Sequence, residues 1–208
     1  MQNLCEEFGG CFDIDPWFIH AYFEESGPVD LSDDASLNTL AQKVDQLILK
    51  ISNKYREYGI TESPYVYLKN DRGTYGMGLL PVFSGEEVLA LNRKKKNKLL
   101  SSKGGMPVTE FILQEGIPTI DSYSGYPIEP VIYVVGGKDI GGFFRIHESK
   151  NELESLNAPG MTFSCLCLHK LDEPHEKFFI DCKEKEKLIT MSRFLAGLDA
   201  IAASYETV

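Results

Sequence analysis

One long amphipathic segment, residues 37–55, constrains the possible folds of this chain more than any other feature. Apolar and aromatic residues recur there at helical spacing: Leu37, Leu40, Ala41, Val44, Leu47, Ile48, Ile51 and Tyr55. Asp33, Asp34 and Ser36 can cap the start of a helix, and Gly59 can end it. The sequence therefore predicts one long helix whose apolar face must pack against another layer of structure.

Strand-like segments make up much of the rest of the chain. Short runs rich in Val, Ile, Phe and Tyr predict strands over residues 65–69, 78–83, 110–114, 129–135, 142–147, 162–169 and 178–181. A short helix is expected over residues 86–97. A second amphipathic helix is expected from the repeat Leu188, Met191, Leu195, Leu198, Ala202 and Tyr205. Residues 1–35 are expected to be irregular. This order indicates the α+β class, with a largely antiparallel sheet and flanking helices.

The composition is that of a globular protein, with 43% hydrophobic and 25% charged residues. The net charge of −10 argues against general attraction to nucleic acid or to an anionic membrane. Residues 93–98 form a local basic run, in which five of six residues are cationic but no aromatic residues are interleaved. We therefore expect a solvated or lid-associated element there rather than a nucleic-acid site.

The sequence also bears on the cellular compartment. No apolar run approaches the roughly 20 residues that a membrane-spanning helix needs, and the first residues lack the pattern of a signal peptide. Five cysteines, at positions 5, 11, 165, 167 and 182, contain no C-x-x-C pair. An odd number without such a pair predicts reduced, mostly buried thiols and a cytoplasmic location.

The segment KNDRGTYGMG, residues 69–78, is the most informative motif. Its glycines allow a loop whose amide groups can approach anionic oxygens closely. Lys69 ends the preceding strand and can meet a phosphate as a point charge, with Arg72 as a second cation. No helix follows at once, so the segment is neither a P-loop nor a Rossmann fingerprint. The alternative is an ordinary hairpin with a glycine-rich turn.

A second segment, TEFILQEGIP, favours nucleotide binding over the plain turn. The strand at residues 110–114 ends in Gln114 and Glu115, and the chain then breaks at Gly116 and Ile117. Backbone groups at such a crossover can hold a nucleotide base. A lysine, a glycine loop and a strand ending in Gln-Glu about 40 residues later resemble the pattern of an ATP-grasp enzyme, with residues 93–105 in a connecting lid.

A closer resemblance rests on five strings in order: KNDRGTYGMG, EFILQEGIPT, IEPVIYVVGG, GGFFRIHES and LNAPG. Together they are similar to an uncommon bacterial glutamate–cysteine ligase family whose nucleotide-binding half is ATP-grasp-like. Members of that family are considerably longer. The resemblance implies an irregular segment at 1–35 that continues from a missing N-terminal part. It also implies a lid and glycine-loop subdomain at 36–108 and a C-terminal ATP-grasp subdomain at 109–208.

The resemblance also implies a chemistry: ATP phosphorylates the γ-carboxylate of glutamate, and the amine of cysteine attacks the acyl phosphate. The substrates are then glutamate, cysteine and ATP, with Mg²⁺ as the metal and a possible N-terminal half on a separate chain. The resemblance assigns the phosphates to Lys69, Gly73, Thr74, Tyr75, Gly76, Met77 and Gly78, and the adenine to Gln114, Glu115, Gly116 and Ile117. Arg72 and Arg145 are the expected catalytic residues.

The metal ligands are less well defined. The candidates are Asp13, Asp15, Asp71, Glu129 and Asn157. Turn residues are the alternative for Asp13 and Asp15, which precede a proline, and for Asn157.

Arg145 interrupts an apolar strand, so it requires an anionic partner. A phosphate or a substrate carboxylate can supply one, and an internal pair with Glu129 or Glu148 is the alternative. A structural role is favoured for His147, and His20, His169 and His175 show no metal-ligand spacing. Two other functions stay open: an ATP-grasp carboxylate–amine ligase with another acceptor, or a non-catalytic ATP-binding fragment.

Overall fold

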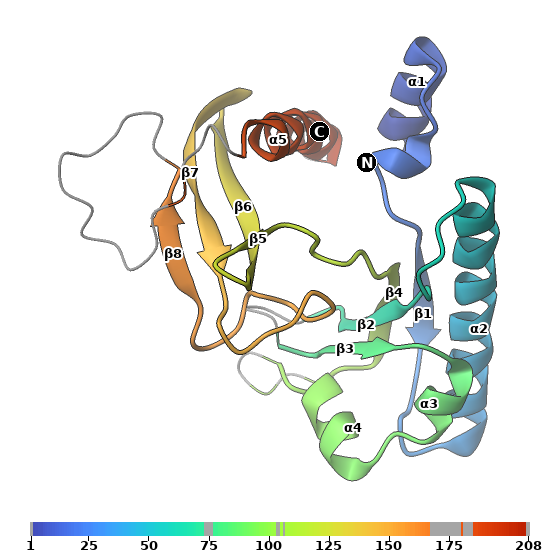
Figure 1. The fold of residues 1–208 in the computed structure, drawn as a ribbon. Coiled ribbons are helices and arrows are strands. Elements are labelled where there is room, and N and C mark those ends of the chain that lie inside the picture. The colour runs from blue at the N-terminus through green and yellow to red at the C-terminus, as the bar shows by residue number, and fades with distance from the viewer. Residues whose placement is uncertain are drawn as a thin grey trace. The chain divides into compact units, whose positions relative to one another are not determined.

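The computed structural model describes residues 2–72, 77–102, 105, 107–166, 180 and 185–206. These residues form two compact units, one of residues 1–20 with 119–208 and the other of residues 21–118. Each unit contains a four-stranded sheet, and the strand pairs within both sheets are antiparallel. The predicted α+β class, with antiparallel sheets and flanking helices, is confirmed (Figure 1).

The unit of residues 21–118 is built on a sheet in the strand order β1-β4-β2-β3. The strands are β1 (Phe23–Pro28), β4 (Glu110–Glu115), β2 (Val66–Asn70) and β3 (Leu79–Val82). Helix α2 (Asp34–Glu57) runs along this sheet, as Figure 1 shows, and buries the face predicted from its periodicity. Asp33 caps the helix, because its side chain accepts a hydrogen bond of 2.8 Å from the Ser36 amide.

The single short helix expected at 86–97 is wrong: two helices, α3 (Gly85–Leu89) and α4 (Arg93–Leu99), occupy this stretch. Each helix has its own cap. The Ser84 hydroxyl accepts from the Glu87 amide, and the Asn92 side chain accepts from the Lys95 amide at 2.9 Å. A capping side chain satisfies amides at the start of a helix, and Asn92 therefore begins a new one.

The other unit contains a sheet in the order β5-β6-β7-β8. Its strands are β5 (Ser122–Tyr123), β6 (Tyr126–Val135), β7 (Lys138–Ile146) and β8 (Thr162–Cys165). Helix α5 (Glu186–Glu206) packs on this sheet, and its buried residues include Ile189, Leu198 and Ala202. The core of the unit comprises Ile128, Phe144, Ile146, Leu166, Ile180 and Ile189. The helix was predicted, but Met191 and Tyr205 of its expected apolar face are exposed.

Four sequence expectations differ from the structure or fall outside it. Residues 1–35, expected to be irregular, contain helix α1 (Gln2–Phe12), the 3-10 helix η1 (Pro16–Phe18) and strand β1. The strand expected at 162–169 ends at Cys165, and most of the one expected at 178–181 lies outside the described residues. Cys165 is disulfide-bonded, which corrects the expectation of uniformly reduced thiols, whereas Cys5 and Cys11 are free.

Candidate functional site

The face of strands β2 and β4 that turns away from α2 carries two of the polar residues singled out by the sequence, Lys69 and Gln114. Successive side chains of a strand point to opposite faces. In β2, Val66 and Leu68 are buried while Tyr67 and Lys69 are half-buried, and in β4 Gln114 is half-buried. Lys69 and Gln114 therefore share one face of the sheet, and we call this surface the Lys69 face.

On the Lys69 face, two residues from separate motifs meet. The Lys69 Nζ atom donates a hydrogen bond of 2.5 Å to Oε1 of Gln114. The register pairs Lys69 with Ile112 and Tyr67 with Gln114, which makes Lys69 and Gln114 diagonal neighbours. Burial lowers the pKa of Lys69 below its ordinary value, because desolvation disfavours the ammonium form. The hydrogen bond of this cation to Gln114 goes to a neutral amide, so an anionic ligand would stabilise it better.

The segment expected to hold a base is tied into the sheet at its start. Glu115 is buried, with 2% of its surface exposed. Its amide donates to Tyr22 O at 2.7 Å, and its carboxylate accepts from the Tyr22 amide at 3.0 Å. The Gly116 amide donates to Tyr65 O at 2.8 Å, whereas Ile117 is 64% exposed. The carboxylate of Glu115 therefore has a structural partner, and the exposed part of this segment begins at Ile117.

Glycine is required at position 116 because a neighbouring side chain packs closely against it, and not because of an unusual backbone angle. A Cβ atom added at Gly116 would lie 2.1 Å from the ring of Tyr65, far inside van der Waals contact. Tyr65 in turn stacks on Phe83, with 5.4 Å between the ring centroids. The ring of Tyr65 therefore fills the space that any side chain at position 116 would need.

The glycine-rich loop is described at its two ends, while Gly73, Thr74, Tyr75 and Gly76 lie outside the described residues. At one end, the Nε atom of Arg72 lies 3.7 Å from the carboxylate of Asp71, and about half of the Arg72 side chain is exposed. At the other end, Met77 is 37% exposed and Gly78 has a φ of +67°. The expected positive φ is thus present at Gly78.

Asn70 is a residue that sequence reasoning missed. It lies at the end of β2 on the buried face, with 6% of its surface exposed. Its Nδ2 atom donates to Leu99 O and to Ser101 O, each at 3.1 Å, and its Oδ1 atom accepts from the Arg72 amide at 2.7 Å. The available signal was an asparagine at a strand position whose alternation predicts burial.

The remaining predicted residues lie in the other unit. Arg145 and Glu129 are direct partners in the β7–β6 register, and Arg145 Nη1 donates to Glu129 Oε1. Their side chains are 18% and 35% exposed. Of the two alternatives for Arg145, the internal pair is present in this structure. Phe143 and Phe163 flank the pair on the same face, with 5.0 Å between their ring centroids.

Two of the predicted metal ligands have conformations typical of turns. Asp13 has a positive φ of 55°, and Asp15 caps η1, because its carboxylate accepts a hydrogen bond of 2.9 Å from the Trp17 amide. Asn157 is half-buried. Within the described part of the chain, no three His, Cys, Asp or Glu residues are gathered to hold a metal ion.

The structural role expected for His147 agrees with its surroundings. The ring is buried, its Nε2 atom lies 3.1 Å from Pro159 O, and its Nδ1 atom lies 3.3 Å from the Ser149 amide. His147 therefore joins the end of β7 to the 156–160 turn.

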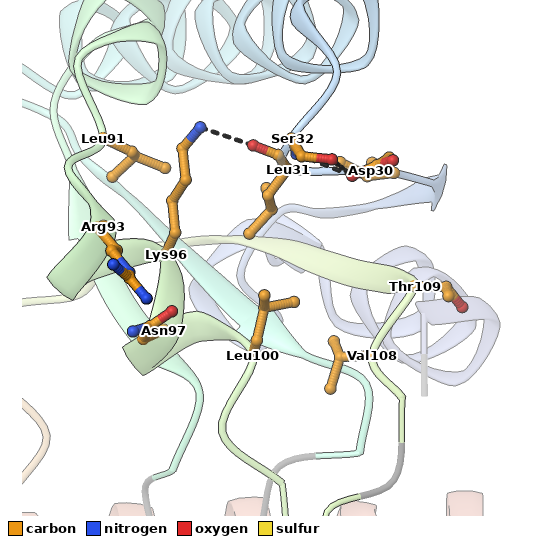
Figure 2. Close-up of a pocket in the computed structure, with 11 residues that line it drawn as sticks. Asp30, Leu31, Ser32, Leu91, Arg93, Lys96, Asn97, Leu100, Val108 and Thr109 are labelled. Atoms are coloured by element: carbon orange, nitrogen blue, oxygen red, sulfur yellow. Dashed lines mark hydrogen bonds between the residues drawn. The ribbon is translucent and has the colours of Figure 1, made fainter.

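A separate groove of about 630 Å³ lies beside α4 (Figure 2). Leu31, Leu91, Leu100 and Val108 are among the apolar residues that line it. Lys96 Nζ donates to Leu31 O at 2.6 Å, so one cation of the basic run is tied to the protein. In the part of the chain that the structure describes, no helix is long and apolar enough to cross a membrane.

Comparisons with known proteins extend over nearly the whole chain. Residues 1–207 match a family model described as GshA, glutamate-cysteine ligase. A crystal structure from Methylobacillus flagellatus KT, described as a "putative gamma-glutamylcysteine synthetase", is similar with a TM-score of 0.78 and 35% sequence identity. The similarity covers 99% of this chain and 49% of that one, so this chain spans about half the length of that relative. No curated protein matches the chain.

Proposed function

Because the chain belongs to the glutamate–cysteine ligase family GshA, we propose that it is the ATP-binding half of an enzyme that forms γ-glutamylcysteine, the first step of glutathione biosynthesis. In this reaction ATP phosphorylates the γ-carboxylate of glutamate, and the amine of cysteine displaces the phosphate as the peptide bond forms. We further propose an ATP-grasp-like fold and a cytoplasmic location. The proposed fold has a lid and glycine-loop subdomain at residues 36–108 and a C-terminal ATP-grasp subdomain at residues 109–208.

The hydrogen bond between Lys69 and Gln114 is the observation that carries this proposal. Desolvation lowers the pKa of the half-buried Lys69 ammonium. A phosphate oxygen would stabilise this cation, because it would accept a charge-assisted hydrogen bond. Lys69 ends the strand that leads into the glycine-rich loop. Lys69 and the glycine-rich loop are thus adjacent in the sequence, and both are proposed to hold the same triphosphate. Gln114 and the exposed Ile117 would place the base at the end of β4.

Magnesium supplies charge neutralisation to the triphosphate when it is bound. Mg²⁺ in such sites keeps several waters and takes one or two carboxylates together with the substrate phosphates. A nucleotide-borne metal therefore needs no preformed cluster of three protein ligands, and the described residues contain none. Asp71, at the base of the loop, is the proposed carboxylate nearest in sequence to the phosphate-binding residues. Asp13, Asp15, Glu129 and Asn157 stay predicted ligands.

Arg72 and Arg145 stay predicted catalytic residues, but the exposure and the ion-pair partners of the two side chains differ. The half-exposed Arg72 follows the lysine by three residues and is proposed to face the transferred phosphoryl group. Arg145 would have to exchange Glu129 for a substrate anion. A guanidinium suits either role, because its fork of donors matches phosphate and carboxylate oxygens.

We propose that ligation also needs protein outside these 208 residues. Two amino-acid substrates must be held in attack geometry, which is worth up to about 7–11 kcal/mol of the barrier. The chain spans 49% of its structural relative, so the residues that hold glutamate and cysteine are expected largely in the remainder or on a partner chain.

Calorimetric titration with Mg·ATP tests the nucleotide site. Wild type should bind in a magnesium-dependent manner, and Lys69→Ala should weaken binding about 10- to 100-fold, the value of one hydrogen bond to a charged group, about 1.5–3 kcal/mol. Lys187→Ala, at an exposed lysine on α5, is the matched control and should bind as wild type does. Folded wild type that binds no ATP would contradict the nucleotide site.

A coupled ADP-release assay tests the assignment as half an enzyme. The 208-residue chain should show little turnover with glutamate and cysteine, and a chain that supplies the remainder should restore it. Robust turnover by the isolated chain would show that both amino-acid sites lie within it.

A further inference from the structure

Asn70 occupies an unusual position for a polar residue. It is the last residue of β2 and lies on the buried face together with Val66 and Leu68. Its side chain lies on the opposite face of the strand from that of Lys69, because successive side chains of a strand point to opposite faces.

 

The side-chain amide of Asn70 makes three hydrogen bonds, which reach two parts of the unit. Oδ1 accepts from the Arg72 amide at 2.7 Å, which turns the chain into the glycine-rich loop. Nδ2 donates to the carbonyl oxygens of Leu99 and Ser101, where α4 ends and the chain continues towards β4. One buried side chain therefore ties the base of the loop to the segment that follows α4.

The other end of the loop closes on the same residue. The backbone N–H of Asn70 donates a hydrogen bond of 2.8 Å to the carbonyl oxygen of Gly78. A Cβ atom at position 78 would lie 2.5 Å from Cβ of Asn70, and the φ of +67° disfavours a side chain there as well. Gly78 is thus fitted against Asn70, so both ends of the loop, at Arg72 and at Gly78, are set by one asparagine.

We propose that Asn70 is a positioning residue for phosphate binding, a role that rests on the proposed function of the loop. Asn70 does not touch the nucleotide in this proposal. It fixes both ends of a segment whose sequence contains three glycines, and glycine loses more backbone entropy on ordering than any other residue. Fixing both ends of a binding segment lowers the conformational entropy that binding costs, and affinity for the phosphates is expected to rise accordingly.

The hydrogen bonds explain why asparagine suits this position. Aspartate keeps an acceptor for the Arg72 amide but places a carboxylate oxygen against the carbonyls of Leu99 and Ser101, which cannot donate. Alanine removes all three side-chain bonds. Asn70→Asp therefore breaks only the hydrogen bonds to Leu99 and Ser101 after α4 and keeps the one from the Arg72 amide. Asn70→Ala breaks the hydrogen bonds on both sides.

The test compares a ligand with three phosphates to one with a single phosphate. Dissociation constants of Mg·ATP and of AMP are measured for the 208-residue wild type, Asn70→Ala and Asn70→Asp, and for Asn38→Ala on the exposed surface of α2 as control. Thermal unfolding identifies the variants that fold. We expect Asn70→Ala to weaken Mg·ATP at least tenfold while AMP changes less than threefold, with Asn70→Asp in between and the control unchanged.

The outcomes separate this proposal from the proposed function. Equal losses of ATP and AMP affinity, or none, in folded Asn70 variants would overturn the positioning role while leaving the nucleotide site intact. Wild type that binds neither ligand would remove the proposed function itself, and the positioning role with it. If Asn70→Ala does not fold, Asn70→Asp carries the same comparison. If neither folds, Asn70 is a residue of the core and the positioning role is rejected.

Discussion

Lys69 Nζ and Gln114 Oε1 lie 2.5 Å apart, although 45 positions separate the two residues in the sequence. The antiparallel register of β2 and β4 brings them together, since Tyr67 pairs with Gln114 and Lys69 with Ile112. A lysine expected to bind phosphate and a glutamine expected to bind a base therefore share one face of the sheet. This contact makes the nucleotide proposal testable through the lysine itself.

The buried charge of Lys69 should appear in the pH dependence of stability. Its folded pKa is below the ordinary value of 10.5, so between the two values the unfolded chain binds more protons than the folded one. In that window the stability of wild type should rise with pH relative to Lys69→Met, which has no such proton. Urea unfolding at several pH values up to 10.5 measures this. A difference between the two proteins that stays constant with pH would contradict the lowered pKa.

Gly116→Ala should destabilise the unit of residues 21–118. The new methyl group would strike the Tyr65 ring at 2.1 Å, and overpacking of this kind costs about 1–3 kcal/mol. Gly197→Ala is the matched control, because nothing lies within 4 Å of a Cβ at that helical position and alanine favours a helix by up to about 1 kcal/mol. Chemical denaturation should show opposite signs for the two variants. Equal stability of Gly116→Ala and wild type would mean that the ring moves freely.

The pair of Arg145 and Glu129 should be energetically coupled. A double-mutant cycle with Arg145→Met and Glu129→Gln should give a coupling energy of about 0.5–3 kcal/mol, since both side chains are largely shielded from water. The pair of Lys54 and Glu57 on α2 serves as control, because Glu57 is 56% exposed and surface pairs contribute about 0–1 kcal/mol. A coupling no larger than the control would indicate that Arg145 is held for another partner.

The two free cysteines in the described part of the chain should differ in reactivity. Cys11 is exposed, whereas Cys5 is fully buried and burial raises the pKa of its thiol. Because the thiolate is the reactive form, brief treatment with N-ethylmaleimide should modify Cys11 at least tenfold faster. Peptide mapping by mass spectrometry gives both rates, and denaturant should make them similar. Comparable rates in the native protein would show that the α1 segment opens readily.

Local patterns in the sequence were sufficient for most of the helices and strands and for several site residues. The periodicity of residues 37–55 predicted α2 and its buried face, and short runs rich in Val, Ile, Phe and Tyr predicted β2 and β4. The motif around Lys69 and the polar end of β4 led to the residues that now share a face. Alternation along β2 could have indicated that Asn70 is buried, but only the structure shows its partners, Leu99 and Ser101, which lie about 30 positions away.

The sequence by itself determined the α+β class and the positions of most helices and strands, because helical and strand periodicities involve neighbours only a few residues apart. The tertiary structure alone decided which polar residues meet. Lys69 contacts Gln114, Arg145 pairs with Glu129 and Glu115 bonds to Tyr22 through strand registers, which depend on the packing of the whole sheet. No local pattern contains that information, since the same alternating strands could be paired in other orders.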